Sequence, residues 1–316
     1  MSQLVSTGRA CPISGSKQAY LVSEKDRHGK PLRNVISKDS GLIFVDPVPF
    51  ENTEEFYKTE YRKSYKGVHS PKPKHVYRAG GNALQRYERI KSLVSDHANT
   101  LDAGSSSGEF VYLMKSRGFR AQGVEANQPY AEYSQKELGI DVAVQPFSEF
   151  RTEEEFDLIS MFHVLEHLEH PIRDLTHLCK SLKNDGVFII EVPNILYPNM
   201  AFRNKWHPGH LFSYSQETLS ALGQTVGLQV IDCNPIGDGG NLWGVFSKCQ
   251  ETNGEAKKAD ATFAEQTLAT LHRDSLSYYK NPRNYFKFFP KLVKQTKEIS
   301  TSRKKTAKQI LDSLYL

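Results

Sequence analysis

The sequence lacks the features of membrane, secreted and disulfide-rich proteins. No apolar run approaches the roughly 20 residues that a transmembrane helix needs. The first residues have neither the charged head nor the apolar stretch of a secretory leader, so we expect none. Scattered cysteines form no disulfide framework (Cys11, Cys179, Cys233 and Cys249). These absences predict a protein of the reducing cytoplasm.

Apolar residues are nevertheless numerous enough for a large core. The 316 residues are 38% hydrophobic and 11% aromatic, which is typical of folded chains. The formal net charge of +5 is concentrated in one segment, Lys280–Lys308, which holds ten Lys and Arg against one acid, Glu298. The remainder is therefore slightly acidic.

From about residue 98 the sequence alternates between short apolar strands and helical segments. Such alternation predicts a parallel sheet covered by helices on both faces. Seven segments are candidate strands: Thr100–Ala103, Ala121–Glu125, Asp141–Val144, Asp157–Phe162, Val187–Val192, Leu228–Cys233 and Leu242–Ser247. We therefore predict an α/β fold with a doubly wound, Rossmann-like, mostly parallel seven-stranded sheet.

The sharpest local pattern is a glycine turn after the first of these strands. The strand ends at Asp102, and the chain turns through Gly104 and Gly108 into a helix. Gly104 permits a tight turn, and Gly108 permits close approach of the backbone to a ligand. An acid here is unusual for a pyrophosphate site but suits a ligand that carries positive charge. Glu125 ends the next strand and can accept two hydrogen bonds from a ribose diol.

Four segments together resemble the class I S-adenosyl-L-methionine (SAM)-dependent methyltransferases. Asp102-Ala-Gly104-Ser-Ser106-Ser-Gly108 is similar to the family's first motif, with Ser106 in place of the middle glycine, and Glu125 matches the acid of the second. Phe156 to Pro171 and Leu182 to Asn194 resemble two later motifs of one branch. The resemblance covers residues 78–250 and implies SAM as the cofactor.

The resemblance also implies roles for individual residues. Asp102 and Gly104 would flank the methionine part of SAM, and Glu125 would hold the ribose. Ser106 and Gly108 would also bind the cofactor. Phe147 would lie near the adenine, and Phe162 and His163 would line the methyl-transfer face.

His163-Val-Leu-Glu-His167, followed by His170, also fits an inverted zinc-protease motif. Both ligands of such a pair must lie on one helical face, but His163 directly follows a predicted strand. We therefore predict no metal there.

The first 50 residues resemble the zinc ribbon with which many relatives begin. Cys11, Ser14, Ser37 and Ser40 occupy the four ligand positions, so three thiolates are missing. Because structural zinc needs four good donors, we predict a ribbon-like fold without metal. The predicted domains are this module (1–50), connecting or lid helices (51–97), the SAM-binding domain (98–250) and a helical basic tail (251–316). Tyr57, Tyr61, Tyr65 and Tyr77 either contribute to a lid or pack ordinarily.

Candidate acceptor-side bases are His163, His207 and His210, because a histidine pKa lies near working pH. The segment Trp206 to Ser215 and the segment Ile236 to Trp243 resemble methyltransferases that act on nucleotide-linked deoxysugars. In those proteins the histidine matching His210 serves the acceptor. Ser215 is predicted to cap the helix that follows.

The sequence thus favours an enzyme, a SAM-dependent methyltransferase that O-methylates a sugar-type small molecule, as in sugar methylation or polysaccharide biosynthesis. Two alternatives stay open: a quinone or lipid-linked acceptor at the inner membrane face, reached through the basic tail, and a non-catalytic scaffold with a methyltransferase fold. No nucleic-acid partner is expected, because no nucleic-acid motif accompanies the tail.

Overall fold

The computed structural model describes residues 3–51, 70–249, 262–281, 296 and 298–316. The chain forms two compact units, which are described separately below. The first comprises Met1–Glu51, Phe162–Thr176 and Ile189–Phe286, and the second comprises Asn52–Met161, His177–Phe188 and Lys287–Leu316.

A seven-stranded sheet confirms the predicted Rossmann-like fold. Its order is β11-β12-β9-β8-β5-β6-β7. The strands are β5 (Asn99–Ala103), β6 (Arg120–Glu125), β7 (Asp141–Val144), β8 (Phe156–Phe162), β9 (Leu182–Pro193), β11 (Leu228–Ile236) and β12 (Asn241–Lys248). The pairs β5–β6, β5–β8 and β6–β7 are parallel, whereas β11 and β12 are antiparallel. β8 and β9 are each divided between the two units.

The central strands are buried along almost their whole length because both faces of a parallel sheet are covered. All five residues of β5 are buried, and six of the seven residues of β8 are buried. The chain moves outward from β5 through β6 to β7 and then returns to β8 on the other side of β5. The order of the strands therefore reverses between β5 and β8, where ligands bind in such sheets.

The helices begin and end where local signals predict. They are α3 (Pro73–Ile90), α4 (Glu109–Ser116), α5 (Gln128–Leu138), α6 (Pro171–Cys179), α7 (Gln216–Thr225), α8 (Phe263–Lys280) and α10 (Ala307–Tyr315), with 3-10 turns η2 (Phe147–Glu149), η3 (Leu165–His167) and η4 (Phe202–Lys205). Ser215 caps α7 through a capping box with Thr218, as predicted. Asn127 caps α5 by accepting a hydrogen bond from the Tyr130 N–H.

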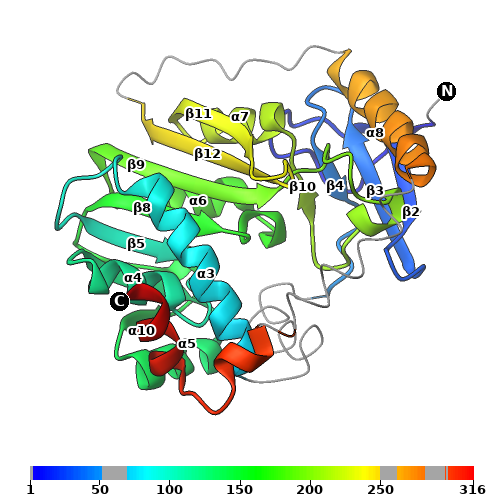
Figure 1. Cartoon of the computed structure of the whole chain (residues 1–316). Coiled ribbons are helices and arrows are strands. Elements are labelled where there is room, and N and C mark those ends of the chain that lie inside the picture. The colour runs from blue at the N-terminus through cyan, green and yellow to red at the C-terminus, as the bar shows by residue number, and fades with distance from the viewer. Residues whose placement is uncertain (1–2, 52–69, 250–261, 282–295, 297) are drawn as a thin grey trace. The chain divides into compact units, whose positions relative to one another are not determined.

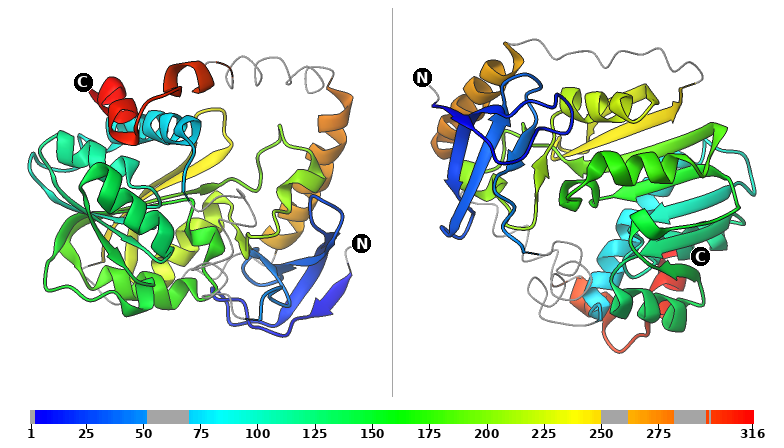
Figure 2. Two further views of the ribbon diagram at one scale, coloured as in Figure 1. Left: turned by 90° about the horizontal axis from the view of Figure 1, so that it is seen from below. Right: turned by 180° about the vertical axis from the view of Figure 1, so that it is seen from behind.

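The first unit contains a five-stranded sheet of order β1-β2-β3-β4-β10, antiparallel throughout. Its strands are β1 (Leu4–Ser6), β2 (Gln18–Lys25), β3 (Pro31–Ser37), β4 (Ile43–Val45) and β10 (Phe212–Ser213). Figures 1 and 2 show α8 lying along this sheet. Ala264, Leu268 and Leu271 of α8 pack into one cluster with Ile36 and Ile43 of the sheet.

The four ribbon positions come together in pairs within this module. Cys11 Sγ lies 3.1 Å from Ser40 Oγ, and Ser14 Oγ lies 3.2 Å from Ser37 Oγ. One thiol–hydroxyl and one hydroxyl–hydroxyl hydrogen bond thus occupy the positions at which a zinc ribbon has metal–thiolate bonds.

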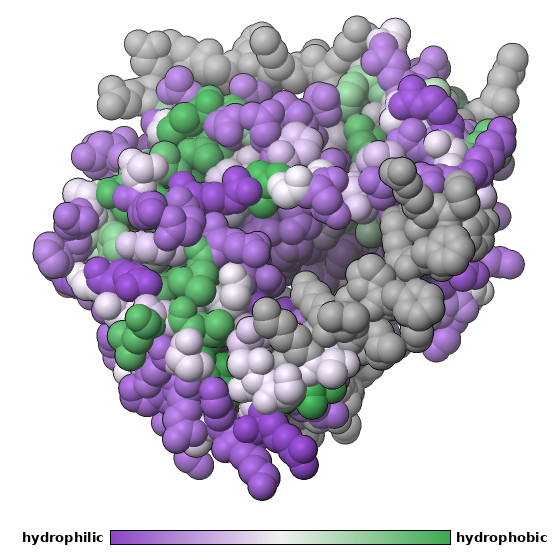
Figure 3. All heavy atoms as spheres, viewed as in Figure 1, coloured by the Kyte–Doolittle hydropathy of each residue, from purple (hydrophilic) through white to green (hydrophobic). Residues whose placement is uncertain are grey.

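The predicted tail is divided between the units, because α8 belongs to the first and α10 to the second. Most of its basic segment lies outside the described residues, as do Tyr57, Tyr61 and Tyr65, whereas Tyr77 lies in α3. No helix in the described part of the chain is long and apolar enough to cross a membrane. On the face shown in Figure 3, hydrophilic side chains predominate and hydrophobic ones occur in small groups.

We predict that the wild-type ribbon module binds no zinc and that three substitutions restore a site. The triple variant Ser14→Cys, Ser37→Cys and Ser40→Cys has four thiolates at the positions that already pair, so it should retain about one zinc ion per chain. Elemental analysis after chelator-free gel filtration measures this. Equal zinc in the wild type and the triple variant would contradict the prediction.

Candidate functional site

The turn after β5 adopts a backbone conformation that favours glycine. Gly104, Ser106 and Gly108 have φ values of 82°, 51° and 82°. The N–H groups of Gly104 and Ser105 both donate to the carbonyl oxygen of Val124, at 2.8 and 3.2 Å, and so attach the turn to β6. Ser106 therefore adopts a left-handed conformation that costs a non-glycine residue free energy.

Gly108 is required by packing at the start of α4. A Cβ atom there would lie 2.3 Å from Ile140 Cδ1 and 2.9 Å from Ser134 Cβ. The sequence interpretation of Gly108 was close approach to a ligand. The structure provides a different reason for glycine, which is the close packing of this turn against α5 and the residue that follows it.

Asp102 lies at the carboxyl end of β5, at the reversal in strand order. Its Oδ1 accepts a 2.7 Å hydrogen bond from Ser160 Oγ of the neighbouring strand β8. Burial raises the pKa of Asp102 to about 6; the Ser160 bond and Arg86 oppose the shift, and Glu125 and Glu109 add to it. A cation placed beside this carboxylate would therefore be stabilised, because it favours the charged form.

Glu125 is also buried, and its carboxylate supports the turn. Oε2 accepts the N–H of Ser106 and Oε1 accepts the N–H of Asn127, each at 2.8 Å. A carboxylate has about four lone-pair positions, so each oxygen can accept a further hydrogen bond. Phe147 follows β7 in η2 and is buried.

In the first unit, His163 lies between two buried carboxylates. Its Nδ1 is 3.5 Å from Glu166 Oε1, and its Nε2 is 3.3 Å from Glu191 Oε1. Burial lowers the pKa of His163, but the interactions with Glu166 and Glu191 outweigh it and raise that pKa to about 9. His163 is therefore an imidazolium at neutral pH, which can donate hydrogen bonds but cannot accept a proton.

Residues around His163 hold these carboxylates in place. Asn241 Nδ2 donates to Glu191 Oε1 at 2.7 Å, and the His163 N–H donates to the Glu191 carbonyl oxygen at 2.8 Å. Phe162, which precedes His163, stacks on Trp243 with ring centroids 5.9 Å apart.

Unlike His163, His207 and His210 are uncharged at neutral pH. Their rings stack with centroids 4.4 Å apart, and the ring of His167 meets that of His210 edge-on at 4.9 Å. Burial and neighbouring cationic groups lower the pKa of His207 to about 3 and that of His210 well below its usual value. Both rings are therefore neutral at pH 7.

Hydrogen bonds to one glycine orient this histidine cluster. His167 Nδ1 donates to the Gly209 carbonyl oxygen at 2.6 Å, and the Gly209 N–H donates to His207 Nδ1 at 2.9 Å. Because Nδ1 of His207 accepts, its Nε2 carries the proton of the neutral ring. The segment between Lys205 and Leu211 thus fixes the tautomer of His207.

The inverted zinc-protease motif does not form a helix. His163 directly follows β8 with a φ of 56°, and His167 lies in η3, a single 3-10 turn of three residues. Within the described ranges, the one group whose ligand atoms all lie within 4.8 Å of one another is Glu166, His167 and His210. It contains neither His163 nor His170, and the absence of a metal stays a prediction.

The comparisons with known proteins agree with this geometry. Residues 77–232 match a family described as a methyltransferase domain. The chain contains a SAM-dependent methyltransferase domain. SAM is accordingly its cofactor. No protein of curated function matches the sequence.

Among solved structures, the methyltransferase domain is similar to three that share its fold. One is CcbJ of Streptomyces caelestis, at 11% identity and a TM-score of 0.48, over 62% of this chain and 99% of that one. A second, from Thermotoga maritima, is described as a possible histamine N-methyltransferase, at 18% identity and 0.47, over 62% and 100%. A third is DesVI of Streptomyces venezuelae, at 14% identity and 0.44, over 54% and 92%.

The residues around the turn fit SAM. SAM carries a sulfonium and an ammonium group, and Asp102, Glu109 and Glu125 place three buried carboxylates around this part of the methyltransferase domain. The remaining lone pairs of Glu125 suit a ribose diol. Glu125 thus joins the predicted residues of the turn, because it binds the Ser106 N–H and its charge acts on Asp102, whereas Phe147 lies apart from them in η2.

Ser160, Glu109 and Glu191 contact or act on the predicted residues but were not themselves predicted from the sequence. Ser160 lies two residues before Phe162 in β8, and Glu191 lies inside the motif that ends at Asn194. Strand alternation could have indicated that Ser160 shares a face with Phe162. Its bond to Asp102 depends on the register between β5 and β8, which the sequence does not contain.

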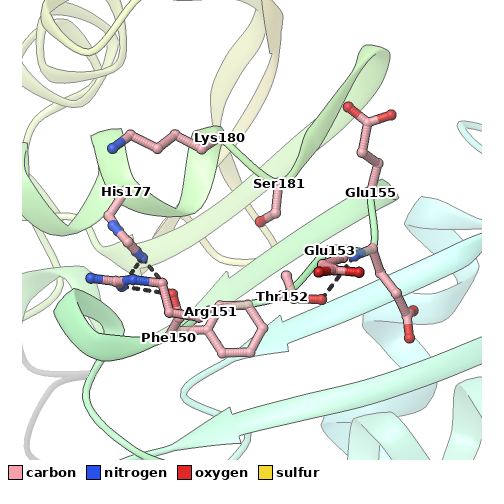
Figure 4. A pocket seen from close by; sticks show the side chains of 9 residues that line it. Phe150, Arg151, Thr152, Glu153, Glu155, His177, Lys180 and Ser181 are labelled. Carbon is pink, nitrogen blue, oxygen red and sulfur yellow. Dashed lines mark hydrogen bonds between the residues drawn. The ribbon is translucent and has the colours of Figure 1, made fainter.

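A cavity of about 220 Å³ lies elsewhere in the methyltransferase domain (Figure 4). It is lined by residues 150–155, which precede β8, and by His177, Lys180 and Ser181, which precede β9. His177 and Arg151 point toward each other, with Nε2 and Nη1 2.7 Å apart. This cavity is at the amino end of β8, so it is not part of the site at the carboxyl ends.

We predict that cofactor affinity falls as the pH falls through 6. Asp102 has its pKa raised to about 6, so below that pH the free protein holds a proton that a cationic ligand must displace. Binding of S-adenosylhomocysteine, which keeps the ammonium group, should weaken roughly tenfold between pH 7 and pH 5. Calorimetric titration across this range measures it.

The matched control is Asp102→Asn, which keeps the shape of the side chain but has no titrating carboxyl. Its binding should be weaker at pH 7 and nearly independent of pH. An equal pH dependence in this variant and the wild type would assign the titration to another group.

Proposed function

We propose that this methyltransferase transfers the methyl group of SAM to a hydroxyl group of a sugar-type small molecule, such as a nucleotide-sugar or a glycan. The acceptor oxygen attacks the methyl carbon, the carbon–sulfur bond breaks, and the products are a methyl ether and S-adenosylhomocysteine. The hydroxyl proton passes to a base, for which His210 is the candidate. The observation that carries the proposal is the buried histidine cluster, in which the neutral His210 ring stacks on His207 and meets His167 edge-on.

A sugar hydroxyl makes a base necessary, because the neutral oxygen is a weak nucleophile and the ether would otherwise retain its proton. His210 is neutral because burial and the neighbouring imidazoles disfavour its charged form. The stacked ring of His207 holds it from one side, and His167 meets it from another. The ring can therefore accept a proton without first losing one.

His163 has a different part in this proposal. As an imidazolium at neutral pH it is a hydrogen-bond donor, which suits binding of a second acceptor hydroxyl rather than removal of a proton. β8 leads from Ser160, which donates to Asp102, to Phe162, and His163 follows three residues after Ser160. The chain thus connects the cofactor residues directly to the proposed acceptor residues.

The acceptor class is tested by incubating the protein with SAM and a panel of nucleotide-sugars, free sugars, quinols and small amines. We expect mass spectrometry to show the gain of one methyl group on a sugar hydroxyl, absent with Asp102→Ala. Methylation of a quinol or an amine alone would contradict the proposed acceptor and leave the cofactor assignment intact.

Replacing His210 separates its proposed role as a base from a packing role. His210→Ala should reduce kcat at pH 7 by about 100-fold, a typical contribution of a general base, with little change in the Kd of S-adenosylhomocysteine. Steady-state kinetics on the identified acceptor and calorimetry measure the two quantities. His170→Ala, at an exposed histidine, is the control. Unchanged turnover in His210→Ala would remove the residue from the mechanism.

A further inference from the structure

Helix α10 packs against the helices that precede and follow β5. Ile310, Leu311 and Tyr315 are buried, and Thr306 caps the helix through a capping box with Gln309. Figures 1 and 2 both show α10 alongside α3. A Cβ atom at Gly80 of α3 would lie 2.7 Å from Leu311 Cδ2, so a side chain at that position would require Leu311 to move.

Polar contacts attach α10 to α4 along the whole length of α4. Tyr315 Oη donates to the Glu109 carbonyl oxygen at 3.0 Å, at the beginning of α4. Tyr112 Oη donates to Asp312 Oδ1 one turn later. Beyond the end of α4, Arg117 Nη2 donates to the Tyr315 carbonyl oxygen at 2.9 Å. Because α10 holds both ends of α4, α4 has little freedom to shift along its axis.

The first of these contacts reaches the cofactor turn. Glu109 directly follows Gly108, and its carboxylate accepts the Ser107 hydroxyl at 2.7 and 2.9 Å. The same carboxylate acts on Asp102 across the turn and helps to raise the pKa of that acid. The position of Glu109 therefore affects both the shape of the turn and the charge that a ligand meets there.

The Tyr315 hydroxyl is well suited to act as a fixed hydrogen-bond donor. The side chain is 3% exposed, and burial raises the pKa of its hydroxyl far above the usual value, so the proton stays in place at any physiological pH. The acceptor is the backbone carbonyl of Glu109, so the hydrogen bond fixes one point of α4 and does not depend on a side-chain rotamer.

We propose that Tyr315 of α10 is a positioning residue for the cofactor site: its hydroxyl holds the carbonyl of Glu109 and so fixes the turn from Gly104 to Gly108 in the conformation that binds SAM. This goes beyond the proposed acceptor chemistry, because it concerns cofactor binding alone. The basic segment of the sequence then leads into a helix that completes the methyltransferase domain.

The test is the affinity of the full chain for S-adenosylhomocysteine, measured by calorimetry. Tyr315→Phe removes one hydroxyl and keeps the ring, and we expect Kd to rise about threefold to tenfold, the range for one hydrogen bond. The measurement is made at a temperature where circular dichroism shows the variant fully folded. Global destabilisation then leaves Kd unchanged, because the folded fraction stays near one.

Tyr279→Phe provides the matched control, since it makes the same change at a half-exposed tyrosine of α8 in the other unit. Its Kd should equal that of the wild type. A Kd in Tyr315→Phe within error of this control, at full folding, would overturn the proposal and leave α10 a purely structural helix.

A second measurement reports the flexibility of the turn itself. Hydrogen–deuterium exchange of peptides covering residues 103–113 should be faster in Tyr315→Phe than in Tyr279→Phe, while exchange in β6 stays the same. Uniformly faster exchange would indicate general loosening and would contradict a positioning role.

Discussion

The proposed cofactor site depends on one electrostatic constraint, a group of buried acids around the glycine turn. Asp102, Glu109 and Glu125 are buried acids within reach of one another's fields. Like charges in a region of low dielectric repel, and the protein offsets this with hydrogen bonds from Ser160, Ser107 and the backbone of the turn. The two positive groups of SAM would offset this repulsion, which fits the position of Asp102 near the carboxyl end of β5.

The strand order and the turn serve this same group of charges. Ser160 can reach Asp102 because β8 pairs with β5 in register, Asp102 opposite Ser160. Glu125 can reach Ser106 because β6 pairs with the other edge of β5 and the turn is attached to Val124. Ser106 adopts a strained φ, and the Glu125 carboxylate that binds its N–H holds it there.

Histidines show how environment alone decides protonation in the first unit. His163 is charged because two carboxylates flank its ring, whereas His207 and His210 are neutral because they are buried against each other and against His167. The sequence could indicate all three as candidates, since the motifs around them are local. It could not tell the charged ring from the neutral ones, because Glu191 and Asn241 reach His163 from β9 and β12. Likewise the glycine turn, the acids and the seven strands were predictable from local patterns. The docking of α10 on Gly80 was not, because it joins residues more than 200 positions apart.

If the N-terminal module binds no zinc, as we predict, packing must supply the folding free energy that a metal would give. A structural zinc ion contributes on the order of 10 kcal/mol or more to the folding of a small module. The two hydrogen bonds at the former ligand positions contribute about 1 kcal/mol each, which is far too little alone. Helix α8 covers the sheet instead, and burial of a side chain such as Ile36, Ile43, Leu268 or Leu271 contributes about 2 kcal/mol. Four such side chains recover most of what the missing thiolates would have supplied. Helix α8 therefore supplies much of the apolar core of this module, although more than 200 residues separate the two in the sequence.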